Sequence, residues 1–320
     1  MTHDIAALRR QGDALQSAVI EGLSSARKSL PSRFLYDERG SELFERITRL
    51  DEYYPTRAES EILRDRAEEI AEFCGKGALL IEYGAGAGVK TEILLAAFAS
   101  PRLYIPIDIA SDELARMATR IRRRFPGLET FPIVADFTRD FMLPRELPRG
   151  PRTAFFPGST IGNLDRGETI SFLRRVRRDV EGRGTAIIGV DLKKDLDVLL
   201  KAYDDRDGVT AAFNLNLLAR INRELGADFA LDRFAHEARW NAVESAVEMH
   251  LVSLDACIVT IGDRKFRFRK GESIHTESSR KYDLDTFARV AEASGWRVAN
   301  IWQDRARRFA VFGLHAATTA

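Results

Sequence analysis

The sequence predicts a doubly wound, mostly parallel α/β sheet with an inserted α+β lobe. Between residues 79 and 191, short apolar runs alternate with amphipathic helical segments. This alternation is typical of parallel strands joined by right-handed crossover helices. After residue 191 it gives way to two helices and several strand-like stretches, which indicates a separate lobe. The alternation resumes at residue 283, so the chain is expected to return to the sheet.

Composition excludes several classes of protein. The chain has 320 residues, and its 49 basic and 48 acidic side chains leave a formal net charge of +1. No overall field would attract nucleic acid or an anionic membrane, and the basic clusters at 120–124 and 174–178 are expected to be solvated helix faces. No run approaches the ~18 apolar residues of a membrane span, and no signal-peptide pattern is present. We therefore expect a cytoplasmic protein that binds neither nucleic acid nor a membrane.

The two cysteines give no sign of a disulfide framework or a metal site. Cys74 and Cys257 are far apart in the sequence and lack metal-ligand spacing. Each is expected to be a small buried or half-buried residue, with no bound metal.

Before the first strand, the pattern predicts helices separated by loops. A helix is expected over residues 1–27. Its apolar face is formed by Ile5, Leu8, Leu15, Val19 and Leu23. A turn at 37–41 leads into a second helix, and 52–57 forms an interruption because the residue before a proline is pushed to extended geometry. A third helix is expected over 60–73.

The sheet elements follow in order. Strands are expected over 79–83, 103–108, 130–135, 154–158 and 185–191, and helices over 91–98, 111–125 and 168–180. In the lobe, helices are expected over 193–203 and 210–225, and strands over 234–240, 247–253, 257–261 and 265–269. A helix capped by Asp283 or Asp285 and stopped by Gly295 precedes two closing strands, 296–302 and 309–315, expected to form an edge hairpin.

The most informative stretch is the turn after the first strand. Leu79-Leu-Ile-Glu-Tyr-Gly-Ala-Gly-Ala-Gly-Val-Lys90 has the order strand, tight turn, helix, and its glycines allow close approach of a ligand to the backbone. The sixth position of the turn is Val89, so the dinucleotide fingerprint G-x-G-x-x-G/A is not met. With Glu82, the pattern is acidic-x-G-x-G-x-G, which is typical of class I methyltransferases that bind S-adenosylmethionine (SAM).

Polar residues at the next strand ends support the same ligand. Asp108 ends the second strand, where a carboxylate can accept both ribose hydroxyls. Asp136 and Phe137 follow the third strand, where the acid can read the adenine amino group and the ring can pack on the base. We therefore predict a SAM site on a class I methyltransferase, Rossmann-like sheet, which the closing hairpin also fits. A nicotinamide oxidoreductase and a non-catalytic SAM-binding protein remain alternatives.

Longer segments resemble one family closely, the SAM-dependent histidine Nα-methyltransferases of ergothioneine biosynthesis. They are Phe34–Phe44, Ile47–Glu59, Gly158–Leu164, Ala202–Asp205, Gly208–Asn214 and Asn222–Leu225. The resemblance covers nearly the whole chain. Fungal relatives that methylate tryptophan-type amines share much of this pattern, so a tryptophan derivative remains the alternative substrate.

The resemblance implies two domains with different roles. Residues 60–195 plus 283–320 would form the SAM-dependent methyltransferase domain, and residues 1–59 plus 196–282 a substrate-binding α+β lobe. A monomer is implied. The product would be the trimethylated betaine hercynine, made from L-histidine by successive transfers.

The resemblance also implies roles for single residues. The amine and carboxylate of the substrate would be held by Tyr53, Asn163 and Tyr203. Glu277 and Ser279 would bind the imidazole, and Met249 would line the side-chain pocket. SAM would be bound by Tyr36, Gly84, Gly86, Lys90, Asp108, Asp136 and Phe137. The local pattern alone would assign Tyr53 to packing, so its role rests on the resemblance.

The implied reaction depends on aligning the amine with the methyl group more than on general acid–base catalysis. The catalytic residues would be Tyr36, Tyr53 and Asn163, which hold a neutral α-amine in line with the methyl group; no strong general base is assigned. A carboxylate and a hydroxyl can bracket the two nitrogens of an imidazole. An indole has one donor and no acceptor, which would leave Glu277 partly unsatisfied at a cost of ~1–3 kcal/mol. Glu277 therefore favours histidine over tryptophan, while His275 nearby is expected to face solvent.

Overall fold

The computed structural model describes residues 2–144 and 146–317, with side chains from Gly12 onward. Ile5 and Leu8, predicted on the face of the first helix, lie outside the described side chains. The chain forms two compact units. One, here called the sheet unit, comprises Tyr54–Lys194 and Ser279–Ala320. The other, the lobe unit, comprises Met1–Tyr53 and Asp195–Ser278.

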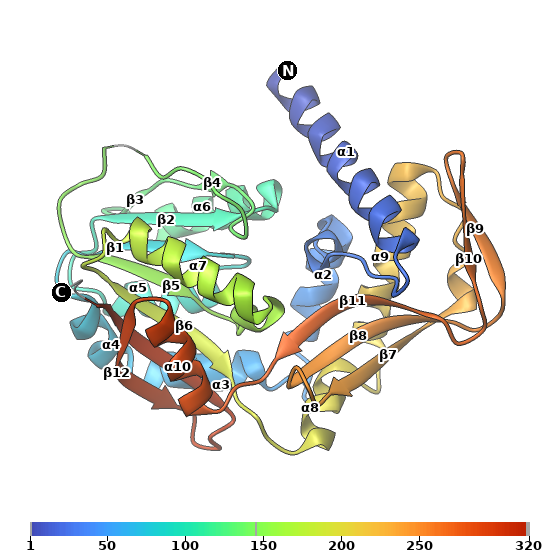
Figure 1. Cartoon of the computed structure of the whole chain (residues 1–320). Helices are drawn as coiled ribbons and strands as arrows, with labels where there is room; N and C mark the ends of the chain where they lie inside the picture. Colours follow the sequence, from blue (N-terminus) through green and yellow to red (C-terminus); the bar gives the residue numbers. More distant parts are fainter. Residues whose placement is uncertain (1, 145, 318–320) are drawn as a thin grey trace. The chain divides into compact units, whose positions relative to one another are not determined.

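The sheet unit is built on one twisted sheet (Figure 1). The strand order is β12-β13-β6-β5-β1-β2-β3, and β4 also pairs with β2. The strands from β6 to β2 run parallel, whereas β13 is antiparallel to both β6 and β12. Their bounds are β1 Leu79–Tyr83, β2 Leu103–Asp108, β3 Glu129–Thr130, β4 Ile133–Val134, β5 Arg152–Phe156, β6 Thr185–Asp191, β12 Trp296–Gln303 and β13 Phe309–Ala316. The predicted doubly wound sheet with an antiparallel edge hairpin is confirmed.

Helices cover both faces of this sheet. They are α3 Pro55–Asp65, α4 Ala67–Cys74, α5 Val89–Ala97, α6 Ser111–Arg124, α7 Arg166–Asp179 and α10 Leu284–Ala293. The helices α7 and α10 pack together over a core of aromatic rings, in which Phe156 and Phe172 have centroids 4.5 Å apart and Phe287 and Phe312 4.6 Å apart. Burying one such ring contributes roughly 1.5–3 kcal/mol, so these contacts fix the sheet against its helices.

Two expected elements of the sheet unit were wrong in their bounds. The helix expected over 60–73 is two helices, and the first begins at Pro55, because proline is well suited to the first turn, where its missing N–H has no partner to lose. The strand expected over 130–135 is two short pieces, β3 and β4. Pro132 lies between them and cannot donate to the strand ladder.

The lobe unit combines helices with antiparallel strands, as predicted. Its helices are α1 Thr2–Ser24, α2 Glu38–Ile47, α8 Leu196–Tyr203 and α9 Val209–Leu225. Its strands form a three-stranded sheet, β11-β8-β7, and a two-stranded ribbon, β10-β9. Their bounds are β7 Phe234–Asn241, β8 Ala246–Ser253, β9 Cys257–Ile261, β10 Arg264–Phe268 and β11 Ser273–Arg280. On α1, Leu15, Val19 and Leu23 are buried, as the periodicity predicts.

The sequence did not predict β11, which runs from the lobe unit into the sheet unit. Its residues are Ser-Ile-His-Thr-Glu-Ser-Ser-Arg, and of its four buried positions only Ile274 is apolar, whereas Thr276, Glu277 and Ser279 are polar. An apolar alternation is the usual signal of a half-buried strand, and here polar side chains occupy most of the buried positions. The β-branched pair Ile274 and Thr276 was the available hint.

Among the described residues, none of the helices is long and apolar enough to cross a membrane.

Asp37 connects α2 to α9, both in the lobe unit. Its Oδ1 accepts hydrogen bonds from the backbone N–H of Gly40, at 2.8 Å, and from Asn216 Nδ2, at 2.7 Å. Its Oδ2 lies 2.6 Å from Arg223 Nη2. The side chain therefore serves both as the N-cap of α2 and as a bond to the neighbouring helix.

We expect Asp37→Ala to lower the free energy of unfolding by about 2 kcal/mol, because it removes a cap and leaves Asn216 without this acceptor. Asp195→Ala is the matched control. Asp195 also caps a helix, α8, but it is exposed, and its side chain is described as accepting only from backbone N–H groups. We expect this substitution to lower the free energy of unfolding by about 1 kcal/mol. Urea denaturation measures both, and equal losses would mean that the contacts to α9 add nothing.

Candidate functional site

The glycine turn between β1 and α5 has a backbone that favours glycine at three positions. Gly84, Gly86 and Gly88 have φ of 69°, 48° and 66°, all in the left-handed region. A Cβ at Gly84 would lie 3.3 Å from the Phe137 ring, and one at Gly88 would lie 2.7 Å from Met117. No atom lies within 4 Å of a Cβ placed on Gly86, so the turn has open space at its middle glycine.

Glu82 braces this turn from within the sheet unit. Its side chain is buried and accepts hydrogen bonds from Thr91 Oγ1, at 2.8 and 2.6 Å, and from the Tyr104 hydroxyl. Burial raises the pKa of Glu82 to about 8, although the Thr91 and Tyr104 hydrogen bonds oppose the rise. The carboxyl group is thus mostly protonated at neutral pH and ties α5 and β2 to the end of β1.

Asp108 and Phe137 lie beside the same turn. The Oδ2 of Asp108 accepts from the Gly86 N–H and its Oδ1 from the Ala110 N–H, both at 2.9 Å. Burial raises the pKa of Asp108, and these backbone donors oppose the rise. The ring of Phe137 packs against Phe156 with centroids 5.3 Å apart. The sheet unit thus brings two predicted cofactor-side groups to the glycine turn.

Asp136, the third predicted strand-end carboxylate, accepts from the backbone N–H of Thr138 at 2.9 Å and from its hydroxyl at 2.5 Å. These local bonds form a turn around Phe137, three residues beyond the end of β4.

Lys90, another predicted cofactor residue, is held by a carboxylate that the sequence reasoning missed. Glu59 on α3 has a buried side chain, and its Oε2 lies 2.5 Å from Lys90 Nζ. The same oxygen accepts from the N–H of Gly158, in the turn after β5, at 2.7 Å. Glu59 thus joins the start of α5 to the turn that leads to Asn163. The only feature of the sequence that could have pointed to Glu59 was its position in the segment Ile47–Glu59, because its neighbours along the chain do not distinguish it from a surface glutamate.

Asn163 ends a short 3-10 helix, Thr160–Asn163, and is half-buried. A Cβ at Gly162 would lie 2.8 Å from the carbonyl oxygen of Arg280, so only glycine allows this backbone to pass so close to the end of β11. Ser159 Oγ accepts a hydrogen bond of 2.9 Å from the N–H of Asp191, which joins this turn to the end of β6.

A second group of predicted residues gathers in the lobe unit around Phe44 and Phe213. The Tyr36 ring lies 5.5 Å from Phe44 and 5.4 Å from Phe213, between centroids. Tyr53 lies 6.2 Å from Phe44 and 6.1 Å from Tyr203. Most of these pairs meet edge to face, the arrangement that aromatic quadrupoles favour. The lobe unit therefore brings Tyr36, Tyr53 and Tyr203 into one aromatic cluster.

A network of polar side chains connects this cluster to the lobe's strands. His236 Nε2 lies 2.7 Å from the carbonyl oxygen of Tyr203, so Nε2 carries the proton. Its Nδ1 then accepts from Asn214 Nδ2, at 2.9 Å. The single hydroxyl proton of Thr276 is shared between two acceptors, Asn214 Oδ1 at 2.7 Å and the carbonyl of Met249 at 3.0 Å. Burial lowers the pKa of His236, which keeps this ring neutral.

Met249 on β8 and Glu277 on β11 are both buried in the lobe unit. Ser279, two residues beyond Glu277 on β11, is buried and belongs to the sheet unit. Asn163, another candidate residue, belongs to the same unit and is half-buried. His275, expected to face solvent, is half-buried, and its Nε2 lies 2.9 Å from Ser278 Oγ. That expectation was wrong because β11 places His275 within a sheet, against the ring of His250.

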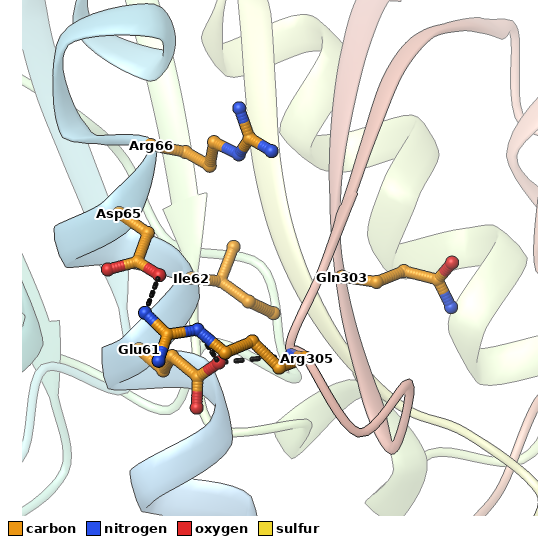
Figure 2. A pocket seen from close by; sticks show the side chains of 6 residues that line it. All are labelled: Glu61, Ile62, Asp65, Arg66, Gln303 and Arg305. Carbon is orange, nitrogen blue, oxygen red and sulfur yellow. Dashed lines mark hydrogen bonds and ion pairs between the residues drawn. The ribbon is translucent and has the colours of Figure 1, made fainter.

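A surface pocket of about 420 Å³ lies elsewhere on the sheet unit (Figure 2). It is lined by Glu61, Ile62, Asp65, Arg66, Gln303 and Arg305. Arg305 reaches toward α3, where it contacts Asp65 at 3.0 Å and Glu61 at 3.5 Å (Figure 2). The pocket contains no predicted site residue, and its charges are largely paired with one another.

Of the two cysteines, Cys74 is buried and Cys257 is half-buried. Cys74 and Cys257 are free thiols, and burial raises the pKa of Cys74 to about 12, which keeps it protonated. Among the described residues, no group of three or more histidine, cysteine or acidic side chains could hold a metal ion.

Comparison with known proteins gives consistent matches over nearly the full length. Residues 15–316 match the profile of a family described as histidine-specific, SAM-dependent methyltransferases. The chain is 43% identical to the histidine N-alpha-methyltransferase of Mycobacterium tuberculosis, covering 92% of this chain and 93% of that protein. It is 40% identical to the protein of the same name from Mycolicibacterium smegmatis, over 93% of each. It is also 28% identical to ergothioneine biosynthesis protein 1 of Neurospora crassa, covering 86% of this chain and 32% of that protein.

The raised pKa of Glu82 predicts a pH-dependent stability. A carboxyl group whose pKa is higher in the folded state stabilises the fold below its unfolded value of about 4.5, and this contribution is lost as pH rises through about 8. We expect Glu82→Gln, which cannot ionise, to gain stability relative to wild type by a few kcal/mol between pH 5 and 8. Denaturation curves at several pH values test this. The exposed Glu129→Gln serves as control and should show a constant difference; a constant difference for Glu82→Gln as well would contradict the prediction.

Proposed function

Because the chain belongs to the family of SAM-dependent, histidine-specific methyltransferases, we propose that it methylates the α-amino group of L-histidine, in successive transfers that end at the trimethylated betaine hercynine. The protein is a SAM-dependent N-methyltransferase, and SAM is its methyl donor. A relative of this chain is named for ergothioneine biosynthesis, and we propose that pathway as the destination of the product.

The residues around the glycine turn fit SAM. The open space at Gly86 allows a ligand to approach the backbone, Asp108 offers a carboxylate at the adjacent strand end, and Phe137 offers an apolar ring beside Gly84. We propose that these residues, together with Lys90 and Asp136, hold the cofactor, with Lys90 offering its ammonium group to the cofactor's carboxylate. When bound, SAM supplies a methyl group already activated by its sulfonium, so the protein has no strong base to provide.

The observation that carries the proposal is the aromatic cluster of Tyr36, Tyr53 and Tyr203 with Phe44 and Phe213. An amine that acquires methyl groups loses N–H donors and becomes a permanent cation. Aromatic faces suit a quaternary ammonium group, because the ring quadrupole attracts the charge and the ring carbons accept the methyl groups. We propose that Tyr53, Asn163 and Tyr203 hold the amine and carboxylate and that Tyr36 lies near the reacting amine.

The choice of histidine is supported by the acid on β11. Glu277 is only 7% exposed, and a carboxylate so far removed from water favours a ligand that donates a hydrogen bond to it. An imidazole N–H can satisfy it while the second ring nitrogen meets a hydroxyl, for which we propose Ser279. Met249, on the neighbouring strand β8, would pack on the ring. A tryptophan derivative, the alternative substrate, has no second ring nitrogen for this arrangement.

Turnover with each of the twenty amino acids tests the substrate. Purified protein is incubated with SAM, and S-adenosylhomocysteine and the methylated products are measured by mass spectrometry. We expect histidine to be converted through mono- and dimethyl forms to a trimethylated product. Preference for tryptophan would establish the alternative, and accumulation of monomethylhistidine would refute successive transfer.

Glu277→Ala tests the ring assignment. We expect the KM for histidine to rise about 10–100-fold, because a buried acceptor for the ring is lost, while the dissociation constant of SAM changes less than about threefold. Glu237→Ala is the matched control, since Glu237 is an exposed glutamate on β7 that pairs with Arg239. It should leave both constants unchanged. Equal losses for histidine and SAM in Glu277→Ala would place Glu277 outside the ring site.

A further inference from the structure

Glu59 lies where the strand order of the sheet unit changes direction. From β1 the chain moves outward to β2 and β3, and it then returns to the other side of β1 to form β5 and β6. Open α/β sheets bind their ligands at the carboxyl ends of the strands that flank such a point. Lys90 follows β1, as the second residue of α5, and Gly158 follows β5. Glu59 contacts both of them, so it joins the two strand ends between which a ligand is expected.

The carboxylate of Glu59 is completely buried, and the fold leaves room for it. Its Oε2 accepts from Lys90 Nζ, at 2.5 Å, and from the Gly158 N–H, at 2.7 Å. Its Oε1 has no hydrogen-bond partner among the residues that the structure describes. This oxygen lies against Gly189 of β6, where a Cβ would be only 2.0 Å away, so residue 189 must be glycine while Glu59 holds its position. A charge so far removed from water persists only when it is paired, and Lys90 is the cation that pairs with it.

The positive charge of Lys90 is therefore compensated at close range. Its side chain is 17% exposed and can meet a ligand, whereas the carboxylate of Glu59 is hidden from solvent. A second cation at the glycine turn, Arg120, is paired in the same way. Its Nε lies 2.6 Å from Glu92 Oε1, and its Nη2 donates to the Ala87 carbonyl. Each of these two cations brings its own carboxylate, so neither offers an anion an uncompensated positive charge.

This compensation bears on the choice of ligand, because the same local architecture otherwise suits phosphate. Backbone N–H groups at a glycine turn and at a helix N-terminus attract anions, and a lysine without a counterion would strengthen that attraction. The amino-acid end of SAM carries one ammonium and one carboxylate group and so has no net charge. A nucleoside diphosphate is a multiple anion. A compensated lysine can bond the carboxylate of a zwitterion, but it gives a phosphate little in return for the water that the phosphate loses.

We propose that Glu59 is a positioning residue that sets cofactor specificity: by holding and neutralising Lys90, it makes the glycine turn accept a zwitterionic amino-acid end and reject nucleotide phosphates. Glu59 does not touch the ligand and acts through Lys90. An ammonium group has three N–H donors, and the contacts described for Lys90 use one of them, on Glu59. The inference rests on the proposed function, which assigns the carboxylate of the cofactor to Lys90.

Calorimetric binding of three adenosine derivatives tests this role. S-adenosylhomocysteine carries the zwitterionic end, ADP carries phosphates, and methylthioadenosine carries neither. We expect wild-type protein to bind ADP at least about tenfold more weakly than methylthioadenosine, because the phosphates lose water without gaining an uncompensated cation. In Glu59→Gln the affinity for ADP should rise about tenfold, while that for uncharged methylthioadenosine should change less than about twofold. Wild-type protein that binds ADP as tightly as methylthioadenosine, or a variant without the gain for ADP, would overturn the proposal.

A gain of affinity separates this role from a structural one, because a damaged fold would weaken the binding of every ligand. The gain must also require Lys90. In the double variant Glu59→Gln/Lys90→Met, the affinity for ADP should return to within about twofold of wild type, and a gain that persists there would contradict the role of Glu59 through Lys90. Glu61→Gln is the matched control. It removes the same charge two residues further along α3, where Glu61 pairs with Arg305 at 3.5 Å, and should change the affinity for ADP less than about twofold.

Two further variants complete the test. If Glu59→Gln does not fold, as judged by thermal denaturation, Glu59→Met removes the charge at similar volume and carries the same measurements. Lys90→Met alone separates this inference from the proposed function. An unchanged affinity for S-adenosylhomocysteine in Lys90→Met would refute the assignment of the cofactor's carboxylate to Lys90. A loss of about tenfold in that variant, without a gain for ADP in Glu59→Gln, would refute the role of Glu59 alone.

Discussion

A carboxyl group that is buried or half-buried at the end of a parallel strand must find hydrogen-bond donors, and three such groups of the sheet unit do so. Glu82 at the end of β1 is satisfied by Thr91 and Tyr104, Asp108 at the end of β2 by backbone N–H groups, and Asp191 at the end of β6 by a tyrosine and two lysines. Each solution ties the strand end to the segment that follows it. The candidate cofactor residues Gly84, Gly86 and Lys90 lie on the segment after β1, so their positions depend on how Glu82 and Asp108 are satisfied.

The three acids are satisfied differently, and their ionisation differs as a result. Glu82 receives only neutral hydroxyl donors, and burial raises its pKa to about 8. Asp191 receives ammonium groups, and its pKa is held down. One network of the lobe unit uses neutral partners instead. It links Tyr203, His236, Asn214 and Thr276, and one carbonyl fixes the proton on the histidine. Both units thus fix the direction of their hydrogen bonds through groups that can act only as donor or only as acceptor.

Much of the fold and part of the site could be predicted from local sequence patterns. The βα alternation predicted the sheet, and the glycine turn with Asp108 and Phe137 predicted a group that the structure brings together. The strand β11 was missed because its buried residues are polar. Glu59 and Lys281 could not be recognised, since their meaning depends on partners 31 and 90 residues away, Lys90 and Asp191, which no periodicity reveals.

The arrangement of β11 has an evolutionary consequence under the proposed assignments. The two residues that would read the aromatic ring are alternate residues of one short strand, whereas the tyrosines near the amine come from other elements of the chain. Ring preference and amine chemistry are therefore encoded in separate segments and can change independently. One or two substitutions on β11 could redirect such a scaffold to a different amino acid while the apparatus for alkylating nitrogen stays intact.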